Sequence, residues 1–169
     1  MDDAARKSFA NFAWGLTGYN LLVILWGAWV RITGSGAGCG EHWPTCHGEI
    51  LPRDAGVETM IELTHRATSG LTLIFTVVLV WKAVKVFAKG ERARTWAWIT
   101  LAFVMAEAAL GALLVLEGLV DKNDSVQRAV VVALHLMNTN GLLGAGALSA
   151  LWASRKRADV PLKVSGLSI

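Results

Sequence analysis

The stretch FAWGLTGYNLLVILWGAWV, residues 12–30, contains no aspartate, glutamate, lysine or arginine. Three further runs are of similar length and mostly apolar, at residues 61–81, 95–116 and 127–153. The hydrocarbon core of a bilayer is ~30 Å thick, and ~20 helical residues cross it. Buried helices of soluble proteins are shorter and carry polar faces. The runs therefore predict an all-α membrane protein, a bundle of four transmembrane helices.

The basic residues predict how this bundle is oriented. Eleven of the 16 lysines and arginines lie before the first run, between the second and third, or after the fourth: Arg6, Lys7, Lys82, Lys85, Lys89, Arg92, Arg94, Arg155, Lys156, Arg157 and Lys163. Because basic residues accumulate on the cytoplasmic side, both termini are expected there. The net charge of +3 then reflects topology and not a nucleic-acid partner.

We expect residues 1–154 to form a single transmembrane domain, with an outer loop at 31–57 and a basic cytoplasmic tail at 155–169. A faint internal repeat relates the two helical hairpins, each of which contains one histidine in its second helix. An axis along the membrane normal would relate such hairpins. The repeat predicts that His65 and His135 lie at equivalent depths.

Ionisable side chains inside a membrane span mark function by default. At 1.5 Å per residue, His65 lies ~12 Å and His135 ~15 Å from the outer ends of their predicted helices. Two imidazoles at matched depth on facing helices suit bis-histidine ligation of a haem. The alternatives are two histidines hydrogen-bonded separately, or a zinc site, which lacks a third and fourth ligand at helical spacing.

Two acidic residues accompany these histidines. Glu62 shares a helix face with His65 and precedes Arg66 by four residues, the favourable order for an intrahelical ion pair. The pair is either only structural, or Arg66 contacts a haem propionate while Glu62 takes part in chemistry. Glu107 lies in the middle of the third run, where a hydrogen bond between helices, a proton path and a subunit contact all remain open.

Both cysteines, Cys39 and Cys46, lie in the predicted outer loop, where an oxidising compartment favours a disulfide. Such a disulfide would either stabilise the glycine-rich loop or be redox-active. His42 and His47 beside it are either metal ligands or, more commonly for loop histidines, only solvated.

Several motifs in this order resemble the haem A synthase family. They are WGAWVRITGSG at 26–36, CGEHWPTCHG at 39–48, IELTHR at 61–66, LGA at 110–112 and ALH at 133–135. The resemblance extends from about residue 20 to residue 150, which is most of the chain.

The resemblance implies a function. Members of that family oxidise a ring methyl of haem O to the formyl group of haem A, in support of cytochrome oxidase assembly. By this resemblance, His65 and His135 are the axial ligands of the substrate-side haem, Glu62 is the essential acidic residue, and Cys39 and Cys46 are the loop cysteine pair. The cofactor would be one haem (b, o or a) per chain, in the plasma membrane of a prokaryote.

The chain also departs from the family pattern. The usual enzyme is about twice as long, with a second four-helix half that holds its own histidine pair, and Glu107 stands where we expect a glutamine. Either two or more copies associate to replace the missing half, which is the expectation, or the chain is a haem-binding relative without the synthase activity. Gly141, Gly144 and Gly146 either let another helix approach closely or serve only internal packing. The expected partners are haem O, membrane lipid, and oxidase-assembly or haem O-producing proteins.

Two other functions remain open from the sequence. The first is a non-catalytic haem-binding, electron-transfer or oxidase-assembly subunit. The second is a quinone-linked, disulfide-forming membrane oxidoreductase, which one cysteine pair without a Cys-x-x-Cys motif matches poorly.

Overall fold

The structure, a computed structural model, describes residues 3–53, 55–121 and 123–155. Within those residues the chain forms four long helices and no extended strand: α1 (Asp3–Ile32), α2 (Val57–Val86), α3 (Arg92–Leu116) and α4 (Val126–Ser154). One short 3-10 helix, η1 (Ser35–Ala37), follows α1. The predicted all-α class is confirmed.

All four helices are long and apolar enough to cross a membrane. Large apolar side chains are exposed on their outer surfaces, among them Leu22 (65% exposed), Ile74 (57%) and Met137 (70%). Water would disfavour such surfaces, whereas lipid tails solvate them. Each of the four predicted apolar runs lies inside one of these helices. The division into one domain and a tail stays a prediction, and residues 156–169 of that tail lie outside the described residues.

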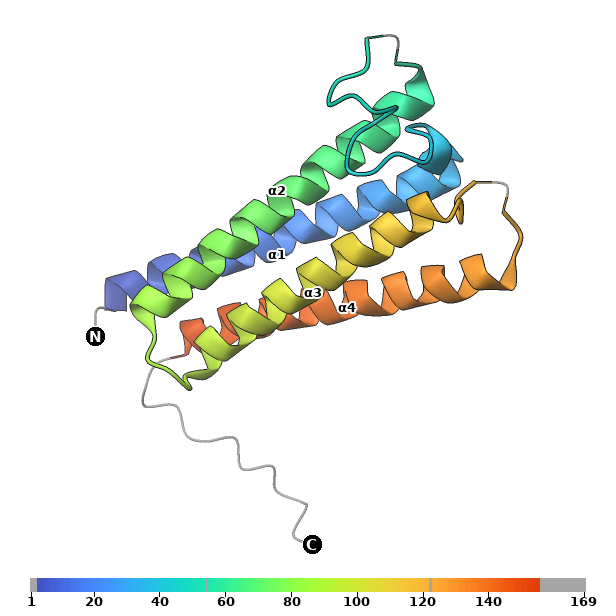
Figure 1. The fold of residues 1–169 in the computed structure, drawn as a ribbon. Helices are drawn as coiled ribbons and strands as arrows, with labels where there is room; N and C mark the ends of the chain where they lie inside the picture. Colours follow the sequence, from blue (N-terminus) through green and yellow to red (C-terminus); the bar gives the residue numbers. More distant parts are fainter. Residues whose placement is uncertain (1–2, 54, 122, 156–169) are drawn as a thin grey trace, which may run out of the picture.

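The helices form a ring. Each helix packs against its neighbours in the chain, and α4 also packs against α1. This order places α2 diagonally across the bundle from α4 (Figure 1). The start of α1, the α2–α3 turn and the end of α4 lie together at one end, here called the inner end (Figure 1). That the inner end faces the cytoplasm, and that the two hairpins form a repeat, both stay predictions.

The hydrophobic core lies in the inner half of the bundle. Its buried residues are mostly small: Phe9, Ala10, Ala13, Leu16, Leu79, Val80, Ala83, Phe87, Ala93, Ala97, Ala150 and Ala153. Alanines let helices approach closely, and close packing without lipid in between stabilises helix association in membranes. This inner core holds the four helices together below the region that carries the histidines.

Buried polar side chains occur along the length of the bundle. Glu62 lies in its outer part, Asn20, Thr72 and Thr139 near its middle, and Thr76, Thr100 and Ser149 toward its inner end. Thr72 donates a hydrogen bond of 3.1 Å to Asn20 Oδ1, which joins α2 to α1. Buried polar groups are costly unless they find partners, and hydrogen bonds of this kind supply such partners inside the bundle.

For two of the three glycines Gly141, Gly144 and Gly146, the structure supports the reading of internal packing. A Cβ on Gly141 would lie 2.5 Å from Phe103 Cε1 of α3, and one on Gly146 would lie 2.9 Å from Thr17 Oγ1 of α1. Gly141 and Gly146 therefore let α3 and α1 pack against α4. A Cβ on Gly144 would meet no atom within 4 Å, so only Gly144 remains available to a neighbouring helix.

Candidate functional site

His65 of α2 lies against the backbone of α1. A Cβ on Gly27 would come within 2.9 Å of His65 Cε1 and 3.1 Å of its Nε2. Only glycine therefore permits this close approach of the ring to α1. The Nδ1 atom of His65 is buried and has no hydrogen-bond partner. A buried ring nitrogen without a partner is unusual and points to a missing ligand or water.

His135 of α4 has an acidic neighbour. Its Nδ1 lies 3.1 Å from Glu107 Oε1 of α3. This contact gives the buried Nδ1 of His135 a charged neighbour, which the buried Nδ1 of His65 lacks. Glu107 also accepts hydrogen bonds from Asn138 Nδ2 and, at 2.5 Å, from Thr139 Oγ1. Of the roles left open for Glu107, the hydrogen bond between helices is therefore present, with α4 as the partner helix.

The bundle brings the two histidines into one interior. The imidazole of His65 is close enough to interact electrostatically with His135 and Glu107. At 1.5 Å per residue, His65 lies ~12 Å from the start of α2 at Val57, and His135 lies ~14 Å from the start of α4 at Val126. The helix bounds agree with the counting from the sequence, and equal depth of the two histidines in the membrane stays a prediction.

Glu62 lies one turn outward from His65 on α2, and its carboxylate is almost completely buried, with 3% of the residue exposed. Its Oε2 accepts a hydrogen bond of 2.7 Å from the backbone N–H of Cys39. Its Oε1 accepts hydrogen bonds from Arg66, at 3.0 Å from Nε and 2.5 Å from Nη2. The ion pair predicted between Glu62 and Arg66 is confirmed, and it is buried rather than directed outward.

Arg66 also connects α2 to the outer loop. Its Nη1 donates hydrogen bonds of 2.6 Å to the backbone carbonyls of His42 and Thr45. The guanidinium is thus shared between the Glu62 carboxylate and the loop. The contact predicted between Arg66 and a haem propionate stays a prediction.

The outer loop is closed by a disulfide between Cys39 and Cys46, which confirms the predicted pair. Both cysteines are completely buried. Thr59 Oγ1 at the start of α2 donates a 2.6 Å hydrogen bond to the carbonyl of Gly38. His47 Nε2 lies 2.8 Å from the same carbonyl, so this histidine has a structural partner in the loop. The disulfide therefore stabilises the loop segment whose backbone holds Glu62.

The donor set suits a haem better than a bare metal ion. Among the residues that the structure describes, no three histidine, cysteine or acidic side chains are grouped so that they could hold a metal ion. Two imidazoles on diagonal helices of one bundle are the ligand pattern of a bis-histidine haem, and the buried Nδ1 of His65 has no hydrogen-bond partner. The residues present therefore fit such a group between α2 and α4.

The chain matches the family described as Cytochrome oxidase assembly protein over residues 10–168. It is 50% identical to a "Protoheme IX farnesyltransferase" of Thermus thermophilus, over 98% of this chain and 27% of that protein. It is 39% identical to "Heme A synthase" of Bacillus cereus (strain AH187), over 68% of this chain and 34% of that protein. A "Heme A synthase" of Bacillus anthracis (strain CDC 684) matches with the same identity and coverage.

The chain thus spans about a quarter to a third of the length of these curated relatives. The name of the Thermus protein describes a much longer molecule and does not assign farnesyl transfer to this stretch. No solved structure matches the chain. The match along nearly the whole chain confirms the resemblance seen in the loop and helix motifs. The chain belongs to the cytochrome oxidase assembly protein family that includes the haem A synthases, and it is a multi-pass protein of the bacterial plasma membrane.

Proposed function

We propose that this chain binds haem O between His65 and His135 and oxidises a ring methyl of that haem to the formyl group of haem A. The step removes four electrons and four protons and takes its oxygen atom from water, so it also requires an external electron acceptor, which receives the four electrons. The observation that carries the proposal is the pair of imidazoles on diagonal helices in one bundle interior, close enough to interact electrostatically. Family membership supports the link to haem and to oxidase assembly.

In this proposal the two histidines hold and orient the macrocycle through its iron. Gly27 fixes the position of the His65 ring by allowing it to lie against α1. Glu107 lies beside the Nδ1 of His135 on the side away from a ligand at Nε2. Such contacts orient ligating histidines and adjust their basicity.

Glu62 is the proposed catalytic group. Oxidation of a methyl on an electron-rich ring develops positive charge at that carbon, and a fixed carboxylate stabilises such charge. Glu62 is fixed by Cys39 N–H and by Arg66, so it needs little reorganisation during the reaction. Glu62 lies one turn outward from His65 on the same helix face, so it would lie near the outer edge of a ring that His65 holds.

The substrate also indicates the partners. A farnesylated haem is made by a protohaem farnesyltransferase, and the Thermus relative that bears this name contains a stretch half identical to the present chain. We therefore propose that the chain receives its substrate from a haem O-producing enzyme. We also propose that it works as a homo-oligomer, with Gly144 facing a neighbouring helix.

The test begins with purified protein from cells that make haem O. We expect a low-spin haem in the reduced-minus-oxidised spectrum, lost in His65→Ala and in His135→Ala but kept in the loop control His42→Ala. Extraction should yield haem O and haem A from the wild type. A colourless wild-type protein from haem-replete cells would refute haem binding.

A second pair of variants separates catalysis from binding. Glu62→Gln keeps the size of the side chain and should retain the haem spectrum while haem A disappears from the extract. Glu58→Gln, in the exposed first turn of α2, is the matched control and should leave haem A formation unchanged. Undiminished haem A in Glu62→Gln would favour the alternative function, a haem-binding or electron-transfer subunit without this activity.

A further inference from the structure

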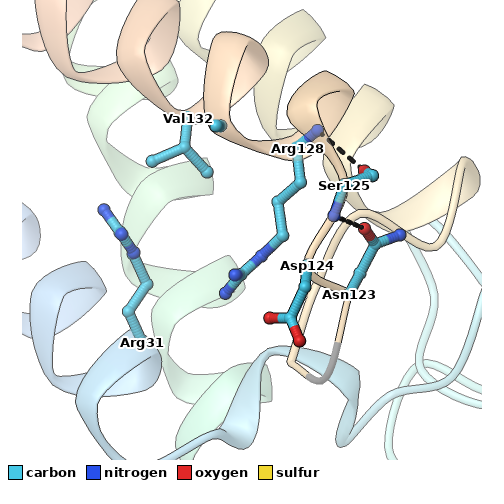
Figure 2. A pocket seen from close by; sticks show the side chains of 7 residues that line it. Arg31, Asn123, Asp124, Ser125, Arg128 and Val132 are labelled. Atoms are coloured by element: carbon cyan, nitrogen blue, oxygen red, sulfur yellow. Dashed lines mark hydrogen bonds between the residues drawn. The ribbon is translucent and has the colours of Figure 1, made fainter.

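The outer end of the bundle carries a second polar feature, an open pocket between α1 and α4 with a volume of about 420 Å³. Arg31 from the last turn of α1 and Arg128 from the first turn of α4 line it, together with Asp124. Figure 2 shows the two arginine side chains extending into the same opening from opposite walls, with the Asp124 carboxylate beside Arg128. Neither arginine belongs to the histidine and glutamate sites already described.

The charges of this pocket are unbalanced. Two guanidinium groups face one carboxylate, and the positive end of the α4 dipole adds to them. The Nε of Arg128 is buried and has no hydrogen-bond partner. Two cations that share a pocket repel each other unless an anion lies between them. The pocket therefore has unused capacity to bind negative charge.

The other polar side chains of the pocket are occupied locally. Ser125 Oγ accepts a hydrogen bond of 3.1 Å from the backbone N–H of Arg128 and so caps α4 (Figure 2). Asn123 Oδ1 accepts the Ser125 N–H at 3.0 Å, and its Nδ2 donates to the carbonyl of Gly118. These bonds shape the wall of the pocket, whereas the arginines supply the donors that face into it.

The positions of the two arginines along α1 and α4 place the pocket outward of the two histidines. Arg31 lies one turn outward from Gly27, the residue that contacts the His65 ring. Arg128 lies two turns, ~10 Å, outward from His135 on the same face of α4, with Val132 between them. Along α1 and α4 the two arginines therefore lie one and two turns outward of the residues at the histidine site.

We infer that Arg31 and Arg128 bind the propionate carboxylates of the haem that His65 and His135 hold, an inference that rests on the proposed function. A haem is a flat ring with two carboxylates on one edge, so a ring held at the histidines with that edge outward presents its anions to this pocket. Planar guanidinium groups suit carboxylates because they donate two parallel hydrogen bonds. Arg66, by contrast, already donates to Glu62 and to two loop carbonyls.

The test compares two probes, ferric protoporphyrin IX and its dimethyl ester, which lacks the anionic carboxylates. Apo-protein in detergent is titrated with each probe, and binding is followed by the low-spin absorption band. The wild type should bind the acid at least tenfold more tightly than the ester. Arg31→Gln/Arg128→Gln should bind both probes equally, at the affinity of the wild type for the ester. Arg31→Lys/Arg128→Lys should recover part of the preference, and Arg53→Gln in the exposed outer loop should behave as the wild type.

The outcomes separate this inference from the proposed function. If the double glutamine variant prefers the acid as strongly as the wild type does, the inference is overturned while haem binding stands. If neither probe binds the wild type, the proposed function itself has failed. An anionic lipid headgroup could use the same arginines, so the titration is repeated with phosphatidylglycerol. Equal wild-type affinity for acid and ester, with lipid bound only when the arginines are present, would assign the pocket to lipid and overturn the inference.

Discussion

Glu107 Oε1 of α3 lies 3.1 Å from Nδ1 of His135 in α4, whereas Nδ1 of His65 in α2 has no acidic partner. The two imidazoles that face one another across the bundle are therefore electrostatically unequal. A carboxylate beside Nδ1 makes an imidazole a stronger electron donor through Nε2 and so favours the more positive oxidation state of a bound iron.

This asymmetry predicts the effect of Glu107→Gln on the bound haem. Glutamine keeps the hydrogen-bonding shape but removes the charge, so the midpoint potential of the haem should rise. A tenfold loss of preference for the ferric state corresponds to a rise of about 59 mV. Redox titration of the absorption spectrum measures this, with Glu117→Gln at the end of α3 as the control. A potential equal to that of the wild type would show that the carboxylate does not act on His135.

Gly27→Ala should impair haem binding without unfolding the bundle. The added methyl group would lie 2.9 Å from His65 Cε1, so the ring must leave its place against α1. We expect a weaker or high-spin haem spectrum. Gly18→Ala is the matched control in the same helix, because a Cβ there meets no atom within 4 Å. Alanine favours a helix over glycine by about 1 kcal/mol, so Gly18→Ala should be as stable as the wild type or more so. Identical spectra for the two variants would contradict the assigned position of His65.

The sequence predicts the helices and the two histidines well because both depend on local patterns. Charge-free runs of membrane length leave few alternatives to a spanning helix. The disulfide could also be predicted from the sequence, because Cys39 and Cys46 are the only cysteines in the chain. For Glu107, the need for a polar partner was predictable, but the identity of Asn138 and Thr139 depends on how α3 and α4 are aligned.

Contacts between distant helices could not be predicted in the same way. Nothing local in the sequence shows that Arg31 and Arg128 share a pocket, because that depends on α1 and α4 closing the ring. The spacing along the chain does contain a signal, because Arg31 is four residues after Gly27 and Arg128 is seven residues before His135. Each arginine therefore shares a helix face with a residue of the histidine site. The fixing of Glu62 by the backbone of Cys39 likewise depends on how the outer loop folds over α2.

Removal of the disulfide should weaken the support of Glu62 more than it weakens haem binding. Cys39→Ser/Cys46→Ser releases a closed loop and should lower the free energy of unfolding by about 2 kcal/mol. The backbone N–H of residue 39, which donates a hydrogen bond to Glu62, then becomes mobile. Haem A formation should therefore fall while the haem spectrum is kept. Thermal unfolding in detergent and pigment extraction measure the two effects. If the variant loses the haem spectrum but unfolds at the same temperature as the wild type, the cysteines instead act on the haem site directly.

Arg66→Gln distinguishes a positioning role from a propionate contact. Arg66 donates to Glu62 and to the carbonyls of His42 and Thr45, so its loss removes the connection between α2 and the outer loop. Breaking a buried ion pair by removing one partner costs about 3–5 kcal/mol. We expect faster proteolysis of the loop and less haem A, with wild-type affinity for ferric protoporphyrin IX. Arg66→Lys should restore little, because one ammonium group cannot reproduce the planar set of donors. If Arg66→Gln instead removes the preference for protoporphyrin IX over its dimethyl ester, then Arg66 contacts the propionates, and the assignment to Arg31 and Arg128 must be revised.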